Sequence, residues 1–471
     1  MSKIINKIAL FNSKHTGFTK AASIILTALM FSVIAYIKPF FPKQWYAGML
    51  FSGSFTTVLL VLLNIRNVKA SISKTGIVFI ALELIIGVSF LINGVAFRAK
   101  GYLAIGVIFT FLVPIMQYLL AKSDIKELVD SFAKGIAIMY LSLLVMSILF
   151  APKLTNFQYV SVLYNKNSLG SFLTIVIPSS FYLFIHSKTL KFRILYWSLL
   201  VSSITLMVFS SSRTAFLAAF FMVLYLVIIE IVNKKRNKDS NKFKPINLVF
   251  YLLATVLVPV VMFLLLSTLR GFIIKQTGPY NIFYTKEEAI ELRLDIEEET
   301  TDFSLDYFGK GFSNTVGEDN LTSGRMTIWK KFLSETKFTG HATESMLVQS
   351  DTRLFKAAYA HNVYIQVAYS VGIIAGVAYL IIVLMAGVKV LAYFVKYVRA
   401  KEKYDLHKIT AYCFVIVFGL SSLAETNYAP FTRFNTTCFW LLSFFFIFKR
   451  TKENTAESEE ENETEATAQD Q

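Results

Sequence analysis

Four short polar motifs of this chain, each beside a long apolar segment, carry residue types that could do chemistry. In order they are Asn165-Lys166-Asn167-Ser168-Leu169-Gly170, Ser212-Arg213-Thr214-Ala215, Gly324-Arg325 with Trp329, and His361-Asn362 with Tyr364. A guanidinium group binds anionic oxygens through a planar fork of N–H donors, and an imidazole exchanges a proton near neutral pH. The motifs therefore offer two arginines as anion ligands and one histidine as a base.

Each of these residues also has an ordinary interpretation. Arg213 follows Ser210, Ser211 and Ser212 at the start of a predicted span, where an arginine commonly extends to the membrane surface. The adjacent hydroxyl groups favour a polar pocket instead, because an arginine at the surface requires none of them. Taken singly, a loop arginine is usually solvated and a histidine beside a span is usually structural.

The Arg325 motif lies in the one long polar segment of the sequence, residues 270–360. A connection of this length is too long to be structureless, and we expect helices at 286–299 and 325–336 in it. Ser323 is placed to cap the second helix. Its apolar residues recur at three- to four-residue spacing, so we expect its buried face to consist of Met326, Trp329, Phe332 and Leu333.

The rest of the chain is apolar enough to lie in a membrane. Of 471 residues, 55% are hydrophobic and 15% aromatic, and the mean hydropathy is +0.55. Because a membrane-spanning helix needs roughly 20 mostly apolar residues, we predict an all-α polytopic membrane protein with about twelve transmembrane helices. These are expected at residues 21–39, 46–64, 76–97, 101–121, 134–151, 168–186, 194–211, 214–232, 246–268, 371–395, 408–426 and 436–448.

The basic residues are distributed unevenly between alternate loops. If the N-terminus is cytoplasmic, 27 lysines and arginines fall inside, in segments 1–20, 66–74, 122–134, 188–193, 234–244, 396–408 and 449–452. The short opposite loops hold only eight: Lys38, Lys43, Arg98, Lys100, Lys153, Lys166, Arg213 and Arg433. This asymmetry predicts that both termini are cytoplasmic, and it explains the net charge of +16 without a nucleic-acid partner.

The same patterns divide the chain into five parts. We expect a basic interfacial N-terminus at 1–20, nine spans within 21–268, an extracytoplasmic catalytic loop at 269–360, three spans within 361–448, and a disordered acidic cytoplasmic tail at 449–471. For residues 1–20, a helix on the inner leaflet and an unstructured basic start both remain open. Cys413 and Cys438 fall inside spans and are expected to pack there, and no metal-ligand spacing is present.

The motifs, in this order and position, resemble the bacterial O-antigen ligase and O-antigen or exopolysaccharide polymerase superfamily. The likeness covers roughly residues 165–376. It includes the run from His361 to Tyr364 followed by Gly372 and Gly376, which is similar to the HN-x-Y…G-x-x-x-G stretch of that family. One departure is Gly340-His341-Ala342, where the family often has Gly-x-Gly.

The resemblance implies a GT-C-like glycosyltransferase architecture and transfer of a glycan from a polyprenyl (undecaprenyl) diphosphate to an acceptor glycan at the outer face of the bacterial cytoplasmic membrane. Arg213 and Arg325 would bind the diphosphate in place of a divalent metal, so neither a metal nor another cofactor is expected. His361 would deprotonate the acceptor. The alternatives for this base are His341 and a loop carboxylate, Glu318 or Asp319.

Further residues and partners follow from the same resemblance. Substrate binding is assigned to the remaining motif residues: Asn165, Asn167, Trp329, Asn362 and Tyr364. Expected partners are the lipid-linked oligosaccharide, the acceptor glycan, the bilayer, a chain-length regulator and a flippase.

Besides an enzyme, two other classes of protein stay open. A transporter or flippase would place several ionisable residues near the middle of its spans, and only Glu83 is expected to be well buried there, with Glu230 near a cytoplasmic end. A non-catalytic scaffold or receptor is the third class.

Among enzymes, a polymerase and a ligase share the donor and differ in the acceptor. Richness in Lys, Ile and Asn hints at a low-GC bacterium, in which capsule or exopolysaccharide polymerisation is the favoured role.

Overall fold

The computed structural model describes residues 2–40, 45–66, 68–149, 154–155, 158–159, 161–163, 165–236, 245–269, 272, 325–349 and 354–452. Several expectations lie outside these residues. They are the helix at 286–299, the cap at Ser323, the alternative bases Glu318 and Asp319, and the tail from residue 453 onwards.

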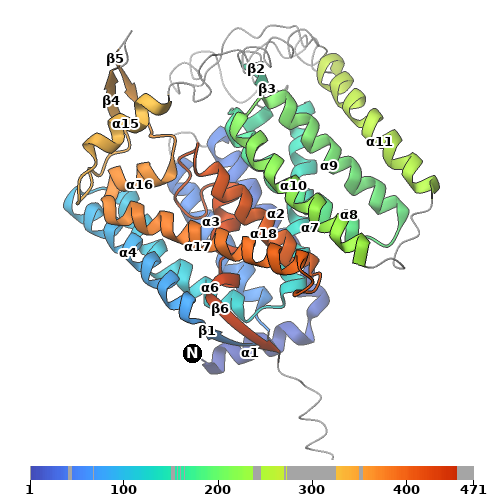
Figure 1. The fold of residues 1–471 in the computed structure, drawn as a ribbon, viewed down its shortest axis with the longest axis horizontal. Helices are drawn as coiled ribbons and strands as arrows, with labels where there is room; N and C mark the ends of the chain where they lie inside the picture. The colour runs from blue at the N-terminus through green and yellow to red at the C-terminus, as the bar shows by residue number, and fades with distance from the viewer. Residues whose placement is uncertain are drawn as a thin grey trace, which may run out of the picture.

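The described part of the chain is mostly helical (Figure 1). The helices before residue 164 are α1 (Ser2–Lys14), α2 (Thr16–Phe40), α3 (Trp45–Asn64), α4 (Lys74–Ala96), α5 (Lys100–Val107), η1 (Ile108–Leu112), α6 (Val113–Ala121), α7 (Ile125–Leu149) and η2 (Ser161–Leu163). Those that follow are α8 (Lys166–His186), α9 (Leu190–Ser210), α10 (Arg213–Arg236), α11 (Pro245–Leu264), η3 (Leu265–Leu269), α15 (Arg325–Glu335), α16 (Val363–Val371), α17 (Ile373–Val398), α18 (Leu406–Ser421), α19 (Phe434–Leu442) and α20 (Phe444–Ile447).

Among the described residues, nine helical segments are long and apolar enough to cross a membrane. Shorter apolar helices at Gly48–Asn64, Leu406–Ser421 and Phe434–Ile447 lie at the predicted second, eleventh and twelfth spans. The prediction of an all-α polytopic membrane protein is therefore confirmed. The number of crossings, their orientation and the GT-C-like arrangement stay predictions.

Short antiparallel strand pairs lie in the connections at the two ends of the bundle. They are β1 (Val68–Ile72) with β6 (Phe448–Lys452), β2 (Leu154–Thr155) with β3 (Gln158–Tyr159), and β4 (Met346–Gln349) with β5 (Leu354–Ala357). In the first pair Val68 is opposite Lys452, so regular structure continues past residue 449, where the disordered tail was expected to begin. That predicted boundary was too early, because the strand pairs with a segment almost 400 residues away in the sequence.

Helix α8 lies at the centre of the bundle and is buried along most of its length, packed by α7, α9, α10 and α18. Aromatic rings fill the space between α4–α6 and α17–α19. The ring centroid of Trp440 lies 5.0 Å from that of Phe109 and 5.6 Å from that of Tyr379. Cys413 and Cys438 are fully buried, which confirms that they are packing residues.

Glu83, the carboxylate noted within a predicted span, forms a bridge between helices. It is buried in α4, and the Gln117 amide of α6 donates to its Oε1 at 2.6 Å. The same amide nitrogen donates to Ser443 Oγ at 2.6 Å. Gln117 thus joins Glu83 of α4 to Ser443, the residue between α19 and α20.

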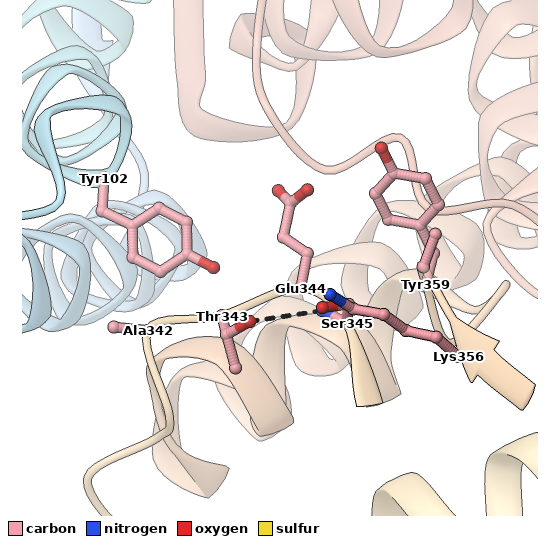
Figure 2. A pocket seen from close by; sticks show the side chains of 8 residues that line it. Tyr102, Ala342, Thr343, Glu344, Ser345, Lys356 and Tyr359 are labelled. Atoms are coloured by element: carbon pink, nitrogen blue, oxygen red, sulfur yellow. Dashed lines mark hydrogen bonds between the residues drawn. The ribbon is translucent and has the colours of Figure 1, made fainter. Parts of the chain in front are cut away.

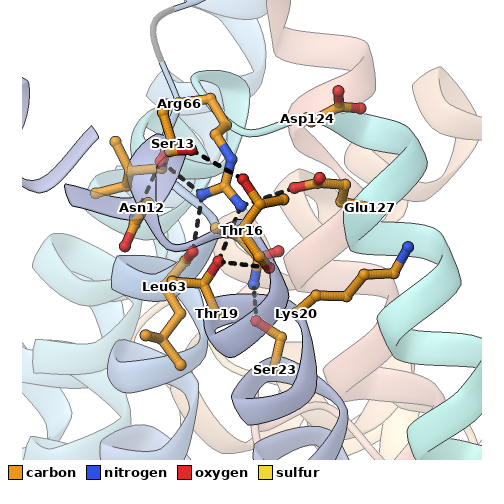
Figure 3. A network of polar contacts seen from close by, with 12 residues as sticks. Asn12, Ser13, Thr16, Thr19, Lys20, Ser23, Leu63, Arg66, Asp124 and Glu127 are labelled. Atoms are coloured by element: carbon orange, nitrogen blue, oxygen red, sulfur yellow. Dashed lines mark hydrogen bonds and ion pairs between the residues drawn. The ribbon is translucent and has the colours of Figure 1, made fainter. Parts of the chain in front are cut away.

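The N-terminal segment is a helix attached to the bundle. Asn12 of α1 donates to the carbonyl oxygens of Leu62 and Ile65, at 2.8 and 3.0 Å. Arg66 donates in turn to Glu127 at the start of α7, at 2.7 Å (Figure 3). The interpretation as an unstructured start is therefore wrong. In Figure 1, α1 and the β1–β6 pair lie at one end of the bundle, and α15 and the β4–β5 pair lie at the other.

Candidate active site

The site begins with Arg325, the first residue of α15. The helix is fixed to α16 by Phe332, whose ring centroid is 4.7 Å from that of Tyr369. This orientation leaves the Arg325 side chain 23% exposed, with Nη1 donating to the Ala424 carbonyl oxygen at 2.7 Å. Its Nη2 lies 4.0 Å from Oε1 of Glu425. Arg325 is thus held in place rather than freely solvated.

The predicted buried face of this helix was correct only in part. Phe332 is fully buried in a small cluster with Tyr369, and Trp329 is half-buried, but Met326 and Leu333 are exposed and Ile328 packs against the cluster instead. The helix has apolar residues on two sides, so the periodicity alone could not select the packed one. The observed orientation directs Arg325 towards the neighbouring loop.

His361 has an unusual backbone and a buried nitrogen. Its φ of +51° lies in the left-handed region, which non-glycine residues adopt rarely and which often marks a functional position. Its Nδ1 is buried and has no hydrogen-bond partner among the described residues. Burial lowers the pKa of His361, and the charge of Arg325 lowers it further. The imidazole is therefore neutral near pH 7, as a base must be.

Asn362 fixes the position of His361. As the N-cap of α16, its Oδ1 accepts hydrogen bonds from the backbone N–H groups of Tyr364 and Ile365, at 3.0 and 3.1 Å. Its Nδ2 donates to the Leu423 carbonyl oxygen at 3.1 Å. Asn362 therefore has a structural role in addition to any contact with substrate.

The segment 422–425 joins the arginine and histidine motifs. The backbone N–H of Val363 donates to Ser422 at 2.9 Å, Asn362 donates to Leu423, and Arg325 donates to Ala424. This segment was not identified from the sequence, because residues 408–426 were interpreted as one span, whereas α18 ends at Ser421. An acidic residue near a span end was the signal that could have identified it.

Glu425 is the carboxylate that this segment contributes. Its side chain is 14% exposed, and its Oε1 is buried without a hydrogen-bond partner among the described residues. Burial raises the pKa of Glu425 to about 7, although the charges of Arg325, Arg433 and Lys166 act to lower it. Three basic groups therefore surround one carboxylate that titrates near neutrality.

A second group of helix ends adjoins this carboxylate. Asn165 caps α8 by accepting hydrogen bonds from the backbone N–H groups of Asn167 and Ser168. Arg433, which precedes α19, donates to Ser168 Oγ at 3.0 Å. From the sequence Arg433 was expected only as a loop charge, and its position beside α8 depends on contacts between residues distant in the chain.

Arg213 begins α10 beside the same helix end. The preceding Ser212 donates to Asn167 Oδ1 at 3.1 Å, and a Cβ on Gly170 would lie 2.9 Å from the Ser212 side chain. The two helix starts are therefore in close contact, which places the half-buried Arg213 beside the Asn165 motif. Helix N-termini attract anions, and here several basic side chains accompany them.

The remaining predicted site residues are placed as follows. Trp329 is half-buried on α15, and its indole N–H has no partner among the described residues. Tyr364 is half-buried on α16, with its ring 6.3 Å from that of Tyr379. His341 stacks on Tyr369 at 4.4 Å between centroids, and its Nε2 donates to the Glu335 carbonyl oxygen at 2.6 Å.

At Gly340-His341-Ala342, where the resembled family often has Gly-x-Gly, the backbone of the third residue is left-handed. Ala342 adopts a φ of +49°, a conformation that glycine adopts without strain. The turn is held because the Ala342 N–H donates to the Ser370 carbonyl oxygen at 2.8 Å. The chain therefore forms this turn with an alanine.

Within the described residues, no group of three or more histidine, cysteine, aspartate or glutamate side chains is arranged to hold a metal ion. Positive charge beside the site comes instead from arginine and lysine. These arginine and lysine side chains suit a ligand whose leaving group is strongly negative.

Comparison with known proteins agrees with the geometry. Residues 198–380 match the family model described as O-Antigen ligase, a region that contains Arg213, Arg325 and His361. No curated protein and no solved structure matches the chain. The match confirms the predicted resemblance and supports glycosyl transfer of the ligase or polymerase type. This chain is a multi-pass membrane protein whose residues 198–380 are similar to the O-Antigen ligase family.

Proposed function

We propose that this protein transfers a glycan from a polyprenyl diphosphate to a hydroxyl group of an acceptor glycan at the outer face of the bacterial cytoplasmic membrane. The observation that carries the proposal is that Arg325 and Asn362, the residue after His361, both donate to carbonyl oxygens of the segment 422–425. Beside them, the His361 Nδ1 is buried without a hydrogen-bond partner among the described residues. An anion ligand and a neutral base are the two groups that such a transfer requires.

In the proposed reaction, His361 takes the proton of the acceptor hydroxyl. The acceptor oxygen then forms a bond to the anomeric carbon, and the bond from that carbon to the diphosphate oxygen breaks. The electron pair of that bond stays on the diphosphate, where the guanidinium groups of Arg325 and Arg213 stabilise the added charge. The proton on His361 passes to the diphosphate or to solvent, so that the base is regenerated.

His361 is favoured over His341 as the base. The Nε2 of His341 faces a carbonyl oxygen, which can only accept, so this nitrogen must carry a proton. His361, in contrast, has a buried Nδ1 without a described partner and lies in reach of the charge of Arg325. A neutral imidazole beside an arginine can accept a proton from a bound hydroxyl.

The acceptor we propose is a second lipid-linked repeat unit, which makes the protein a capsule or exopolysaccharide polymerase. A chain-length regulator and a flippase would then act beside it. A ligase that attaches the glycan to another acceptor is the alternative.

Reconstitution distinguishes these functions. Purified protein in liposomes would receive polyprenyl diphosphate-linked oligosaccharide as the only glycan. A polymerase gives a ladder of longer glycans and releases polyprenyl diphosphate. A ligase gives no ladder until a different acceptor is added, and a transporter gives no new glycosidic bond in either case.

A further inference from the structure

A cavity beside the candidate active site is not used by the proposed roles of the arginines and the histidine. Its volume is about 610 Å³, and its lining includes Tyr102 of α5, Glu344, Lys356 and Tyr359. Figure 2 shows the Glu344 carboxylate projecting into the space between the rings of Tyr102 and Tyr359. Sites for small ligands occupy roughly 300–1,000 Å³, so the cavity has the size of one.

Glu344 is held in place and still has capacity for a ligand. The Tyr428 hydroxyl donates to its Oε1 at 2.5 Å, and an ionised carboxylate offers about four acceptor positions. Lys356, whose side chain extends towards Ser345 in Figure 2, contributes a flexible ammonium donor to the lining. The cavity therefore combines a fixed acceptor with a mobile donor.

The backbone that carries Glu344 is attached to α16. Ser370 Oγ donates to the Thr343 carbonyl oxygen at 3.1 Å, and Gln366 Nε2 lies 3.4 Å from the Glu344 carbonyl oxygen. The amide of Gln366 is fully buried. These contacts fix one wall of the cavity before any ligand binds.

The same glutamine links the cavity to the candidate base. Its Oε1 accepts a hydrogen bond at 2.7 Å from the backbone N–H of Ala360, the residue before His361. Tyr359 and Ala358, which line the cavity, precede Ala360 directly. A ligand in the cavity would therefore lie along the segment that ends at His361.

We propose that this cavity is a saccharide subsite that binds a sugar ring of the acceptor glycan. This proposal rests on the proposed function and adds the place where the acceptor binds. Tyrosine rings offer flat apolar faces to the C–H groups of a sugar, while Glu344 accepts hydrogen bonds from adjacent hydroxyl groups. Lys356 donates to a ring or hydroxyl oxygen. The Tyr428 contact orients the carboxylate towards the bound sugar.

Glycoside binding tests this subsite without any lipid donor. Full-length protein would be purified in an amine-oxide detergent, which has no sugar head group to compete. Saturation-transfer NMR would be measured with methyl α-D-glucoside, methyl α-D-galactoside and methyl N-acetyl-α-D-glucosaminide. The wild type should transfer saturation to the ring protons of at least one glycoside. Glu344→Gln and Tyr359→Leu should each weaken that binding by about tenfold or more, because the first removes a charged hydrogen-bond acceptor and the second removes an aromatic face.

Glu335→Gln is the matched control. Glu335 is an exposed carboxylate on α15 that pairs with Lys331, and it lies outside the cavity lining. This variant should bind glycosides as the wild type does. Size-exclusion profiles would establish that each variant is folded.

The possible outcomes separate the subsite from the proposed function. The absence of signal with all three glycosides, or equal binding by Glu344→Gln and the wild type, overturns the subsite. If the wild type transfers glycans in liposomes but binds no glycoside, only the subsite is wrong. If glycosides bind and Glu344→Gln loses them, while no donor is ever used, the subsite stands and the proposed transferase function fails.

Discussion

Arg325 Nη2 lies 4.0 Å from the carboxylate oxygen of Glu425, although the two residues are 100 positions apart in the sequence. The same guanidinium donates to Ala424, so its orientation is fixed before a ligand arrives. A guanidinium has five N–H donors, and these contacts involve only some of them. Arg325 can therefore still bind an anion, and the ionisation of Glu425 changes the electrostatic potential at that position.

The first prediction concerns this modulation. Because the pKa of Glu425 is raised to about 7, the carboxyl group is mostly neutral at pH 6 and mostly ionised at pH 8. Ionised Glu425 opposes binding of an anionic donor near Arg325. The KM for the lipid-linked donor should therefore rise about threefold to tenfold between pH 6 and pH 8, as expected for an ion pair of roughly 1 kcal/mol.

Glu425→Gln should remove most of this pH dependence and keep the low KM at pH 8. The exposed Glu335→Gln variant should behave as the wild type does. An unchanged pH dependence in Glu425→Gln would show that another group controls donor binding.

A second prediction concerns the protonation of His361. Burial and Arg325 both lower its pKa, so it should titrate below the ordinary value of about 6.5. Arg325→Met removes one of these effects and should move the titration upwards. The chain has only five histidines, so NMR of histidine-labelled protein can follow each, with His361→Gln for assignment. A His361 pKa that is the same in both proteins would contradict the described proximity.

Membrane orientation gives a third prediction. Lys337 is exposed near the end of α15, and Lys401 is exposed between α17 and α18. Lys337→Cys should react with a membrane-impermeant maleimide in intact cells, and Lys401→Cys should react only after permeabilisation. The native cysteines are buried, so background labelling should be low. The reverse pattern would place the candidate site on the cytoplasmic side.

Metal removal provides a fourth prediction. If guanidinium groups neutralise the diphosphate, glycan transfer in liposomes should continue in excess EDTA. Product formation would be compared before and after chelation at constant ionic strength. Loss of activity that magnesium or manganese restores would contradict the assignment of this role to Arg213 and Arg325.

The sequence predicted the helical elements and the motifs better than their packing. Long apolar runs identified the spans, and Asn362 was selected by its motif, because both signals are local. The role of Glu425 depends on contacts with residues 100 positions away, which no local spacing reveals. Similarly, the periodicity of α15 identified a helix, but only packing against Tyr369 selected the buried side.

The boundaries near chain reversals were also hard to predict. The helix break between α16 and α17 occurs at Gly372, whose φ of +111° is open to glycine and strained for other residues. The sequence showed the glycine but not whether it would interrupt the helix. Strand β6 was missed because its partner β1 lies near the other end of the chain.

In the proposed reaction, two arginines bind the leaving diphosphate and His361 activates the acceptor. Arg325→Lys and Arg213→Lys keep the charge and lose the planar fork of donors. Each should lower the turnover number by on the order of 10²–10³, the effect of losing one oxyanion contact. His361→Ala should lower turnover while leaving the donor KM nearly unchanged, because a base acts on the acceptor.

The most direct test is the turnover number of these variants in liposomes, normalised to folded protein. Lys330→Ala, an exposed change on α15, is the control for lost charge and should retain wild-type turnover. The turnover number should fall strongly in both arginine variants and in His361→Ala. Wild-type turnover by well-folded Arg325→Lys and Arg213→Lys would contradict it.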